Sequence, residues 1–359
     1  MVRNIEDNRE NENLSKINVA VVGATGVVGR EIIKIIGEGY LPVNNVYALA
    51  SYQSKGKKIS MTINKQLEVH CLDEFDFKSN KVDIAFFCAG SEISKKYAEK
   101  VASEGCIVID KSSLFRMDKD VPLIVPEVNL NDLKKFNKKN IIATPNCTTI
   151  PLAMCLKPLD DKFKIKRVVV TTFQSVSGSG KKGMDELYNQ TKGFFEASVQ
   201  NLSTDTLHGE VYSKQIAFNC IPQCDTFSTN GSTKEEDKIV NEVEKILGKK
   251  LPISAMCVRV PVFRCHGESV NIEFEKNIEI EDIVETLSNS KGLIVSDRQE
   301  DGGYYTQAEC VGEDCAFVSR IKRDMSVENG INFWLVVDNV RKGSALNGVQ
   351  IANELIKLL

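Results

Sequence analysis

A single cysteine stands where the sequence turns from a short apolar run into a helix-like segment. Residues 141–143 are apolar, residues 144–146 interrupt the run, and Cys147 follows. Asn146 is a preferred N-cap residue, and Pro151 suits the first turn of a helix, where a missing N–H is tolerated. Unpaired N–H groups at a helix N-terminus favour the thiolate, the nucleophilic form of cysteine. The pattern therefore indicates a nucleophilic thiol, although most free cysteines are simply buried small side chains.

A glycine-rich turn near the N-terminus is the second candidate for chemistry. Residues 17–22 form an apolar run typical of a buried strand, residues 23–29 carry glycines spaced G-x-x-G-x-x-G, and residues 30–36 have helical periodicity. A strand, a glycine turn and a helix bring a pyrophosphate onto helix N–H groups. Glycine spacing alone also occurs in tight turns. The strand before and the helix after it favour nucleotide binding.

The loop after the next predicted strand bears on the choice of cofactor. Residues 46–50 read as a strand, and residues 51–58 follow with hydroxyl, amide and ammonium groups but no carboxylate. An NAD-selective fold places Asp or Glu here to bind the ribose hydroxyls. This loop suits a 2′-phosphate instead, or it is only a solvated basic loop.

The remaining elements of the first half alternate between strand and helix. Strands are predicted at residues 82–88 and 106–109, with a helix at 94–103 between them, and the alternation favours a doubly wound parallel sheet. Residues 110–128 read as a loop that carries Arg116. Its guanidinium could bind an anion bidentately, although such an arginine is more often a surface ion pair.

After Cys147 the strands become longer and β-branched. Residues 167–174 predict a strand that runs into a flexible serine- and glycine-rich loop, and residues 186–207 look like a polar helical excursion on the surface. An amphipathic helix opens at residues 233–238, with Glu235 and Lys238 three apart on one face. From spacing alone, these two residues form an ordinary helical ion pair. The apolar stripe of this helix is Ile239, Val243, Ile246 and Leu247.

The C-terminal part adds three strands and a closing helix. Strands are predicted around residues 255–263, 268–274 and 331–337, with Arg259 and His266 between or beside the first two, and residues 344–359 form the helix. Long strands and a return helix fit an α+β domain inserted in a nucleotide-binding one.

Composition excludes several classes of protein. The chain has 359 residues and a formal net charge of −3 with interleaved acids and bases, so nothing favours nucleic acid or an anionic membrane. No apolar run approaches a membrane span. Eleven scattered cysteines and three histidines fit a reducing cytoplasm, and the pairs Cys220/Cys224 and Cys310/Cys315 are interpreted as packing residues rather than a zinc site. Residues 1–16 are polar and predict a disordered tail.

Several motifs in the same order resemble the bacterial type of aspartate-semialdehyde dehydrogenase from Val19 onward. They are the glycine turn 23–29, Phe115-Arg116, VPLIVPEVN at 121–129, PNCTT at 145–149, QSVSG at 174–178, CVRVP at 257–261 and Asp338-Asn339. The resemblance implies a Rossmann-type NADP-binding domain with an inserted α+β catalytic and dimerisation domain. It would divide the chain into the tail, the NADP-binding domain at 17–146 plus 340–359, and the catalytic domain at 147–339.

The resemblance also implies a role for each candidate residue. Cys147 matches the nucleophile, His266 the acid/base, and Gln174 the residue that positions the thiol and the reacting oxygen. The other roles follow in the same way: Arg259 and Glu235 for the substrate's carboxylate and amino group, Arg116 and Lys238 for phosphate, and Gly23, Thr25, Gly26, Val27, Val28, Gln53, Ser54, Ser177, Gly178 and Asn339 for NADP.

The implied reaction is the NADPH-dependent reduction of L-aspartyl-4-phosphate to L-aspartate 4-semialdehyde and phosphate through a cysteine thioester. It belongs to the aspartate pathway to lysine and diaminopimelate, methionine and threonine. No metal is implied, the location is cytoplasmic, and the expected assembly is a homodimer or a homotetramer. Gln53 stands where the family often has arginine, which weakens the expected selection of the 2′-phosphate.

Two other functions are compatible with part of this pattern. N-acetyl-gamma-glutamyl-phosphate reductase shares the architecture and the thioester, but its substrate has a blocked amine that Glu235 would not meet. A non-catalytic NADP-binding redox sensor with Cys147 as the sensing thiol has no need of an acid/base, a glutamine and two anion sites together.

Overall fold

The computed structural model describes residues 15–196 and 209–358, which form two compact units. Unit 1 comprises Met1–Ala153, Glu242–Gly248 and Arg341–Leu359, and unit 2 comprises Met154–Asn241 and Lys249–Val340. The predicted tail at 1–16 lies outside the described residues except for residues 15 and 16. Residues 197–207 of the predicted excursion also lie outside them.

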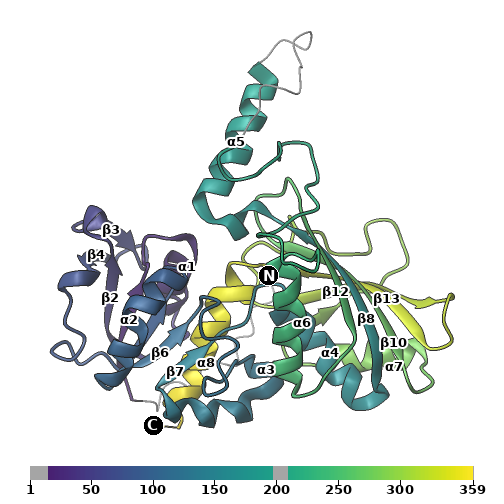
Figure 1. The fold of residues 1–359 in the computed structure, drawn as a ribbon, viewed down its shortest axis with the longest axis horizontal. Helices are drawn as coiled ribbons and strands as arrows, with labels where there is room; N and C mark the ends of the chain where they lie inside the picture. Colours follow the sequence, from purple (N-terminus) through teal and green to yellow (C-terminus); the bar gives the residue numbers. More distant parts are fainter. Residues whose placement is uncertain (1–14, 197–208, 359) are drawn as a thin grey trace. The chain divides into compact units, whose positions relative to one another are not determined.

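Unit 1 is built on a seven-stranded sheet in the order β3-β4-β2-β1-β5-β6-β7 (Figure 1). All neighbouring strands are parallel except β3 and β4. The strands are β1 (Ile17–Val22), β2 (Val43–Ala50), β3 (Lys58–Ser60), β4 (Gln66–Cys71), β5 (Ile84–Phe87), β6 (Ile107–Asp110) and β7 (Ile141–Ala143).

The helices of unit 1 cover both faces of this sheet. The connection from β1 to β2 runs through α1 (Val27–Gly37), and that from β5 to β6 runs the other way through α2 (Ser91–Ser103). Because such crossovers are right-handed, the two helices lie on opposite faces. Strands β5, β6 and β7 are accordingly buried at every position. The predicted doubly wound parallel sheet is confirmed.

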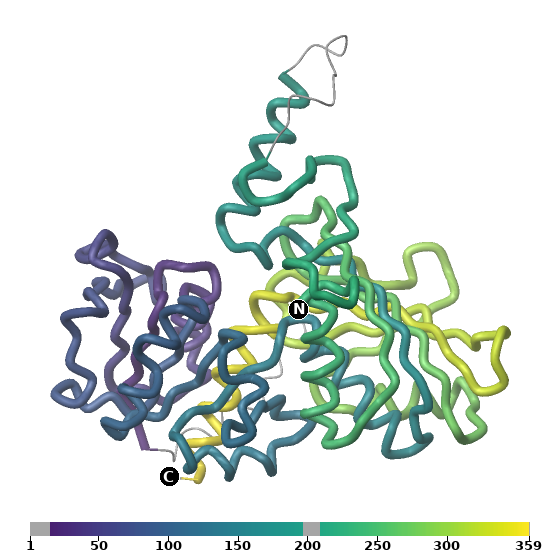
Figure 2. Tube along the Cα trace, viewed as in Figure 1, coloured from purple at the N-terminus to yellow at the C-terminus, as the bar shows by residue number. Residues whose placement is uncertain are grey.

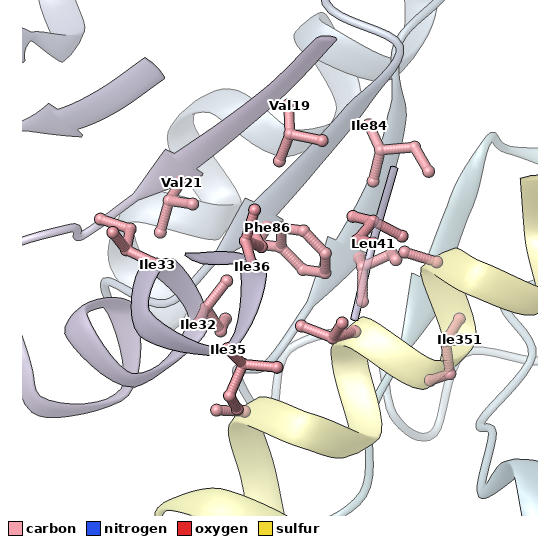
Figure 3. Close-up of a cluster of buried hydrophobic side chains, with 14 of the residues drawn as sticks. Val19, Val21, Ile32, Ile33, Ile35, Ile36, Leu41, Ile84, Phe86 and Ile351 are labelled. Atoms are coloured by element: carbon pink, nitrogen blue, oxygen red, sulfur yellow. The ribbon is translucent and has the colours of Figure 1, made fainter. Parts of the chain in front are cut away.

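The C-terminus completes unit 1 beside its N-terminal elements. A π-helical turn (Arg341–Leu346) leads into α8 (Asn347–Ile356), and Figure 2 traces this yellow segment back to the earlier strands. In Figure 3, Val19, Ile35, Phe86 and Ile351 converge from β1, α1, β5 and α8 on one apolar core. The predicted loop at 110–128 is correct for residues 111–125, because Asp110 ends β6 and α3 (Pro126–Asn129) begins at residue 126, followed by a 3-10 segment (Leu130–Lys138).

Unit 2 is built on a six-stranded mixed sheet in the order β11-β12-β13-β10-β8-β9. The strands are β8 (Ile165–Gln174), β9 (Ile253–Arg259), β10 (His266–Phe274), β11 (Leu293–Val295), β12 (Ala316–Asp324) and β13 (Gly330–Val337). In β8 and β10, alternate residues are buried and part-exposed, so one face of the sheet is packed and the other is partly open. Helix α5 (Gly180–Glu196) extends away from this sheet (Figure 1).

The described residues contain three further α-helices. They are α4 (Thr149–Phe163), α6 (Lys234–Leu247) and α7 (Ile280–Ser288). The division between the units falls inside α4 and α6. The predicted apolar stripe of α6 is confirmed for Ile239, Val243 and Ile246, which are buried, whereas Leu247 is only partly buried.

Candidate functional site

The glycine turn lies at the point where the strand order of unit 1 reverses. Strands β1 and β5 are neighbours, and their crossovers diverge, so the loops after both strands meet at a topological switch point, where such sheets bind ligands. Gly23 has φ +85°, and a Cβ there would lie 2.9 Å from the backbone carbon and oxygen of Cys88. Only glycine allows this conformation and this close approach.

The other predicted residues of this turn lead directly into α1. The N–H of Gly26 donates to the carbonyl of Gly23 at 3.0 Å, and Gly26 is the residue before the first helical position, Val27. Thr25, Val27 and Val28 therefore lie at the helix N-terminus, where N–H groups have no partner within the helix. This arrangement fits the pyrophosphate of a dinucleotide.

Gln53 and Ser54 lie in a 3-10 turn (Tyr52–Ser54) directly after β2, the strand beside β1. Two lysines follow in the same loop, and Lys55 forms an ion pair with Glu74 at 2.5 Å. Lys57 instead donates to the hydroxyl of Ser54 at 3.4 Å. Lys57 is thus the cation next to the predicted ribose-binding residues.

The cysteine turn follows β7 in unit 1. The carbonyl of Asn146 accepts from the N–H of Ile150 at 3.1 Å, as an N-cap residue does, and Pro151 lies in the first turn of α4. The side-chain oxygen of Asn146 bonds the N–H of Cys147 at 2.6 Å and its thiol at 3.2 Å, rather than an N–H two or three residues further on. The expected position of Cys147 just before a helix is confirmed, and Asn146 contacts the thiol itself.

A buried carboxylate holds this turn in place. Glu242 accepts from the Arg116 guanidinium at 2.8 Å with one oxygen and from the N–H of Asn146 at 2.6 Å with the other. Arg116 is only 8% exposed, so the surface ion-pair alternative is wrong. The sequence analysis missed Glu242, although a glutamate among Ile239, Val243 and Ile246 on an apolar helix face was a signal.

Three predicted residues form a row at one end of the sheet in unit 2. Gln174 and Arg259 end the parallel neighbours β8 and β9 and are paired in register. His266 begins β10, and the pairing of Gly267 with Phe173 places His266 opposite Gln174. All three side chains are buried. The register of three strands thus brings together residues that are far apart in the sequence.

The hydrogen bonds of His266 determine its protonation. The N–H of Ser175 donates to Nδ1 at 3.0 Å, so Nδ1 carries no proton, and in the neutral ring the proton is on Nε2. Burial, and then the neighbouring Arg259 guanidinium, lower the pKa of His266 to about 3. Nε2 is buried without a hydrogen-bond partner among the described residues. His266 is therefore a neutral imidazole whose Nε2–H is available as a donor.

Charged and amide groups connect Gln174 to α6. The amide of Gln174 donates to Glu235 at 3.0 Å, and Glu235 pairs with Lys238 at 3.0 Å, which confirms the ion pair expected from spacing. Asp225, which the sequence analysis did not identify, binds Lys238 at 2.7 Å. Burial opposes the charge on Lys238, but the Glu235 and Asp225 carboxylates outweigh it and raise its pKa.

The predicted cofactor residues of unit 2 surround His266. Asn339 uses its side-chain oxygen to accept from the hydroxyls of Ser175 and Ser177 and from the N–H of Cys265, at 3.0–3.3 Å. A Cβ on Gly178 would lie 3.1 Å from the Arg259 guanidinium and 3.5 Å from the His266 ring. Ser175, which the sequence analysis missed, also accepts from Arg259 at 2.6 Å through its carbonyl.

Unit 1 therefore contains Cys147, Arg116, the glycine turn and the Gln53 loop, and unit 2 brings the other predicted residues together. No group of His, Cys, Asp and Glu in residues 15–196 or 209–358 could hold a metal ion. The interpretation of four cysteines as packing residues holds for Cys224, Cys310 and Cys315, which are buried, but is wrong for Cys220, which is exposed. Within the described part of the chain, no helix is long and apolar enough to cross a membrane.

Two family profiles match most of the chain. The profile described as semialdehyde dehydrogenase, NAD binding domain, matches residues 18–136. The profile described as semialdehyde dehydrogenase, dimerisation domain, matches residues 156–342. The class defined by fold and site is therefore that of semialdehyde dehydrogenases.

Relatives narrow this class further. Aspartate-semialdehyde dehydrogenase of Rickettsia bellii is 50% identical over 344 residues, covering 95% of this chain and 98% of that protein. That of Aquifex aeolicus is 46% identical over 94% of this chain and 98% of its own. Among solved structures, aspartate semialdehyde dehydrogenase II from Vibrio cholerae matches with a TM-score of 0.90 and 42% identity, covering 96% and 99% of the two chains. The chain belongs to the aspartate-semialdehyde dehydrogenase family of oxidoreductases, as the sequence motifs predicted.

Proposed function

We propose that the protein reduces L-aspartyl-4-phosphate to L-aspartate 4-semialdehyde and phosphate with NADPH, through a thioester on Cys147, in the aspartate pathway to lysine, methionine and threonine. The observation that carries the proposal is the row of His266, Gln174 and Arg259, with Glu235 bound to Gln174. It supplies an acid/base, an amide and opposite charges for a small substrate that has both a carboxylate and an ammonium group. The Vibrio cholerae relative has also been solved in complex with ASA.

Cys147 is the proposed nucleophile. Its thiolate attacks the acyl carbon of the substrate and forms a C–S bond while the C–O bond to phosphate breaks, which leaves an acyl-enzyme thioester. The side chain of Asn146 contacts the thiol and orients it. A nucleophilic thiol requires a reducing compartment, so we place the enzyme in the cytoplasm.

His266 is the proposed proton donor. Because Nδ1 accepts from Ser175, the proton that His266 can give is on Nε2. With a pKa lowered to about 3, the ring is neutral near pH 7, so it donates from Nε2 to the oxygen anion that forms when hydride adds to the thioester carbonyl. It regains this proton as the oxygen becomes the aldehyde carbonyl and the C–S bond breaks to release the Cys147 thiolate.

Arg259 and Glu235 are the proposed partners of the α-carboxylate and the α-amine. Arg259 is directed by its bond to the Ser175 carbonyl, and Glu235 by Gln174 and Lys238. A planar guanidinium suits a carboxylate, and a carboxylate suits an ammonium group. Arg116 and Lys238 are the proposed cations for phosphate.

The glycine turn, the Gln53 loop, Ser177, Gly178 and Asn339 are the proposed binding residues for the cofactor, which as NADPH would supply hydride. Gly23 approaches the backbone after β5 too closely for any side chain, which fits a turn built for backbone contact with a pyrophosphate. We infer a preference for NADP over NAD because the loop at 51–58 has no carboxylate and Lys57 lies beside Ser54. A distant relative from Candida albicans has been solved with NADP.

We further propose that residues 17–146 and 340–359 bind the cofactor and that residues 147–339 provide catalysis and dimerisation. The compact units add 147–153 and Glu242–Gly248 to the cofactor-binding part. The partly open face of the sheet in unit 2, with Met256 55% exposed, supports a homodimer. Gel filtration with light scattering would distinguish a monomer, a dimer and a tetramer.

One assay tests the proposed reaction. Purified protein is given NADP, inorganic phosphate and aspartate semialdehyde, or the N-acetylated glutamate semialdehyde in a parallel reaction. We expect phosphate-dependent NADPH formation with the aspartyl substrate and at least tenfold less with the other, because Glu235 has no ammonium group to bind there. A preference for the acetylated substrate would favour the reductase alternative, and no turnover with either would favour the redox sensor.

A further inference from the structure

A partly buried lysine that the proposed mechanism does not use lies at the carboxyl edge of the sheet in unit 1. Strands β5, β6 and β7 are neighbours, and Phe87, Asp110 and Ala143 are aligned across them. The next residue of each strand is Cys88, Lys111 and Thr144, so these three form one row where the strands end. Cys147 follows Thr144 by three residues, in the same turn.

The ammonium group of Lys111 is held by backbone and hydroxyl oxygens. Nζ donates to the carbonyl of Ser344 at 2.7 Å and to the hydroxyl of Thr144 at 3.4 Å. On the side of α8, a Cβ added to Gly348 would lie 3.2 Å from Nζ. The side chain of Lys111 thus occupies a defined position between the cysteine turn and the C-terminal segment.

No carboxylate neutralises this cation at contact distance. The adjacent Asp110 directs its two oxygens to the hydroxyls of Ser94 and Ser112, at 2.5 and 2.6 Å. In the described parts of the chain, Lys111 forms no ion pair within 4 Å, unlike the buried Lys342, which pairs with Glu127 at 2.6 Å. Even a partly buried charge without an oppositely charged partner is costly, so the position favours an anion nearby.

The charged and titratable groups around Lys111 identify that anion. Nζ interacts electrostatically with the thiols of Cys88 and Cys147, with the Asp110 carboxylate and with the Arg116 guanidinium. Burial raises the pKa of Cys88 to about 12, so Cys88 remains a neutral thiol. The Asp110 oxygens are bound to the hydroxyls of Ser94 and Ser112, so Cys147 is the other nearby group that can acquire a negative charge.

We propose that Lys111 is a positioning residue whose ammonium group stabilises the thiolate of Cys147. The inference rests on the proposed role of Cys147 as nucleophile and adds an electrostatic partner from the neighbouring strand end. Lys111 acts through Cys147 and forms no bond to substrate.

The two charges support each other. Burial lowers the pKa of Lys111 to about 8, and a charge on Cys147 acts in the opposite direction. Each group therefore favours the charged form of the other, and the pair titrates as a coupled system. Near pH 7 Lys111 is mostly protonated and can stabilise the thiolate.

The test is the pH dependence of alkylation of Cys147 by iodoacetamide in the full chain, followed by mass spectrometry of the Cys147 peptide. A Cys220→Ser background removes the exposed thiol. Lys111→Met should move the midpoint of the rate profile upward by about one pH unit, which is roughly a tenfold lower rate at neutral pH. Lys111→Arg, which keeps the charge, should restore most of the rate.

Two further variants keep the test decisive. Lys139→Met removes a half-exposed lysine paired with Asp118 and should leave the midpoint unchanged. Gly348→Ala displaces Nζ without removing its charge and should shift the midpoint in the same direction by less. An unmoved midpoint in Lys111→Met, or in Gly348→Ala if the first variant does not fold, overturns the proposal. Because alkylation requires no turnover, an active Cys147→Ala would refute the proposed function separately.

Discussion

The candidate sites of the two units differ in what positions their functional groups. In unit 1, the glycine turn and the cysteine turn lie at the ends of parallel strands, and main-chain N–H and carbonyl groups make most of their bonds. In unit 2, His266, Gln174 and Arg259 extend from three neighbouring strands. Their side chains are held by hydrogen bonds, Gln174 to Glu235 and the other two to the main chain of Ser175.

This difference predicts which substitutions each unit tolerates. A site made of main-chain groups depends on φ angles and close approach, so a single added methyl group can disturb it. A site made of side chains depends on strand register and on matched donors and acceptors, so loss of one partner leaves another buried and unsatisfied. Cys147, like Arg116 and Lys111, is an exception in unit 1, and its side chain carries the proposed chemistry.

Replacing this exceptional side chain should have the largest effect. Cys147→Ala should lower turnover by roughly 10⁴-fold or more, since the proposed thioester cannot form. The melting temperature and NADP affinity should stay near those of the parent, because the half-buried thiol contributes little packing. Activity above a few per cent of the parent in a steady-state assay would reject the nucleophile assignment.

The next largest effect should come from the histidine of unit 2. His266→Asn should lower kcat by roughly 10²–10⁴-fold while the acyl-enzyme still forms, which a rapid-quench burst experiment can detect. In the parent, the rate should show no loss near pH 6.5 due to His266, because its pKa is lowered to about 3 by burial and then by Arg259. If the substitution changes only KM, His266 binds substrate and does not transfer a proton.

The lowered pKa of His266 also makes the folded state less stable as the pH falls. The unfolded chain binds a proton at His266 below about pH 6.5, whereas the folded chain does so only near pH 3. Acidification across this range therefore favours the unfolded state. The free energy of unfolding of His266→Asn should fall less steeply between pH 6.5 and 4 than that of the parent.

The two phosphate-binding candidates compare the units directly. Arg116→Ala and Lys238→Ala should each raise KM for phosphate. Loss of one charge-assisted contact should weaken the binding free energy of phosphate by on the order of 1.5–3 kcal/mol. Arg116→Ala should also lower the melting temperature, because Glu242 loses its buried partner. Lys238 is more exposed, so its loss should affect the melting temperature less. An unchanged phosphate KM in both variants would leave them with structural roles alone.

The smallest change tests the main-chain character of unit 1. Gly23→Ala must place a Cβ 2.9 Å from the backbone of Cys88 at φ +85°. Gly105→Ala is the matched control, since Gly105 has φ +96° with nothing within 4 Å of the added atom. The control should cost about 1–2 kcal/mol of unfolding free energy. Gly23→Ala should cost more and weaken NADP binding in a titration, and equal behaviour of the two variants would contradict the close-approach argument.

Local signals predicted unit 1 better than unit 2. The expected strand at 17–22 matches β1, because apolar residues, a glycine turn and a helical repeat follow each other without a gap. Strands β3 and β4 went unrecognised, since β3 has only three residues and exposed polar residues interrupt the apolar ones in both. β12 was also missed, as its buried residues adjoin exposed charges at its end.

The residues of the candidate site were predictable from the sequence, but the contacts between them were not. Motifs indicated His266, Gln174 and Arg259, but only strand register places them side by side. Glu242 and Lys111 acquire their roles from contacts across more than thirty residues of sequence, which no local pattern encodes. Only the tertiary structure shows whether a charged residue on an apolar helix face has a hydrogen-bonding or oppositely charged partner.

Burial makes most of the thiols in this cysteine-rich chain unreactive. Transfer out of water penalises the charged form, and it raises the pKa of seven of them: Cys88, Cys106, Cys155, Cys224, Cys257, Cys265 and Cys310. Oxidants and electrophiles react with thiolates, so these side chains resist damage. An electrophilic inhibitor aimed at Cys147 would therefore meet little competition from within the protein, apart from exposed Cys220.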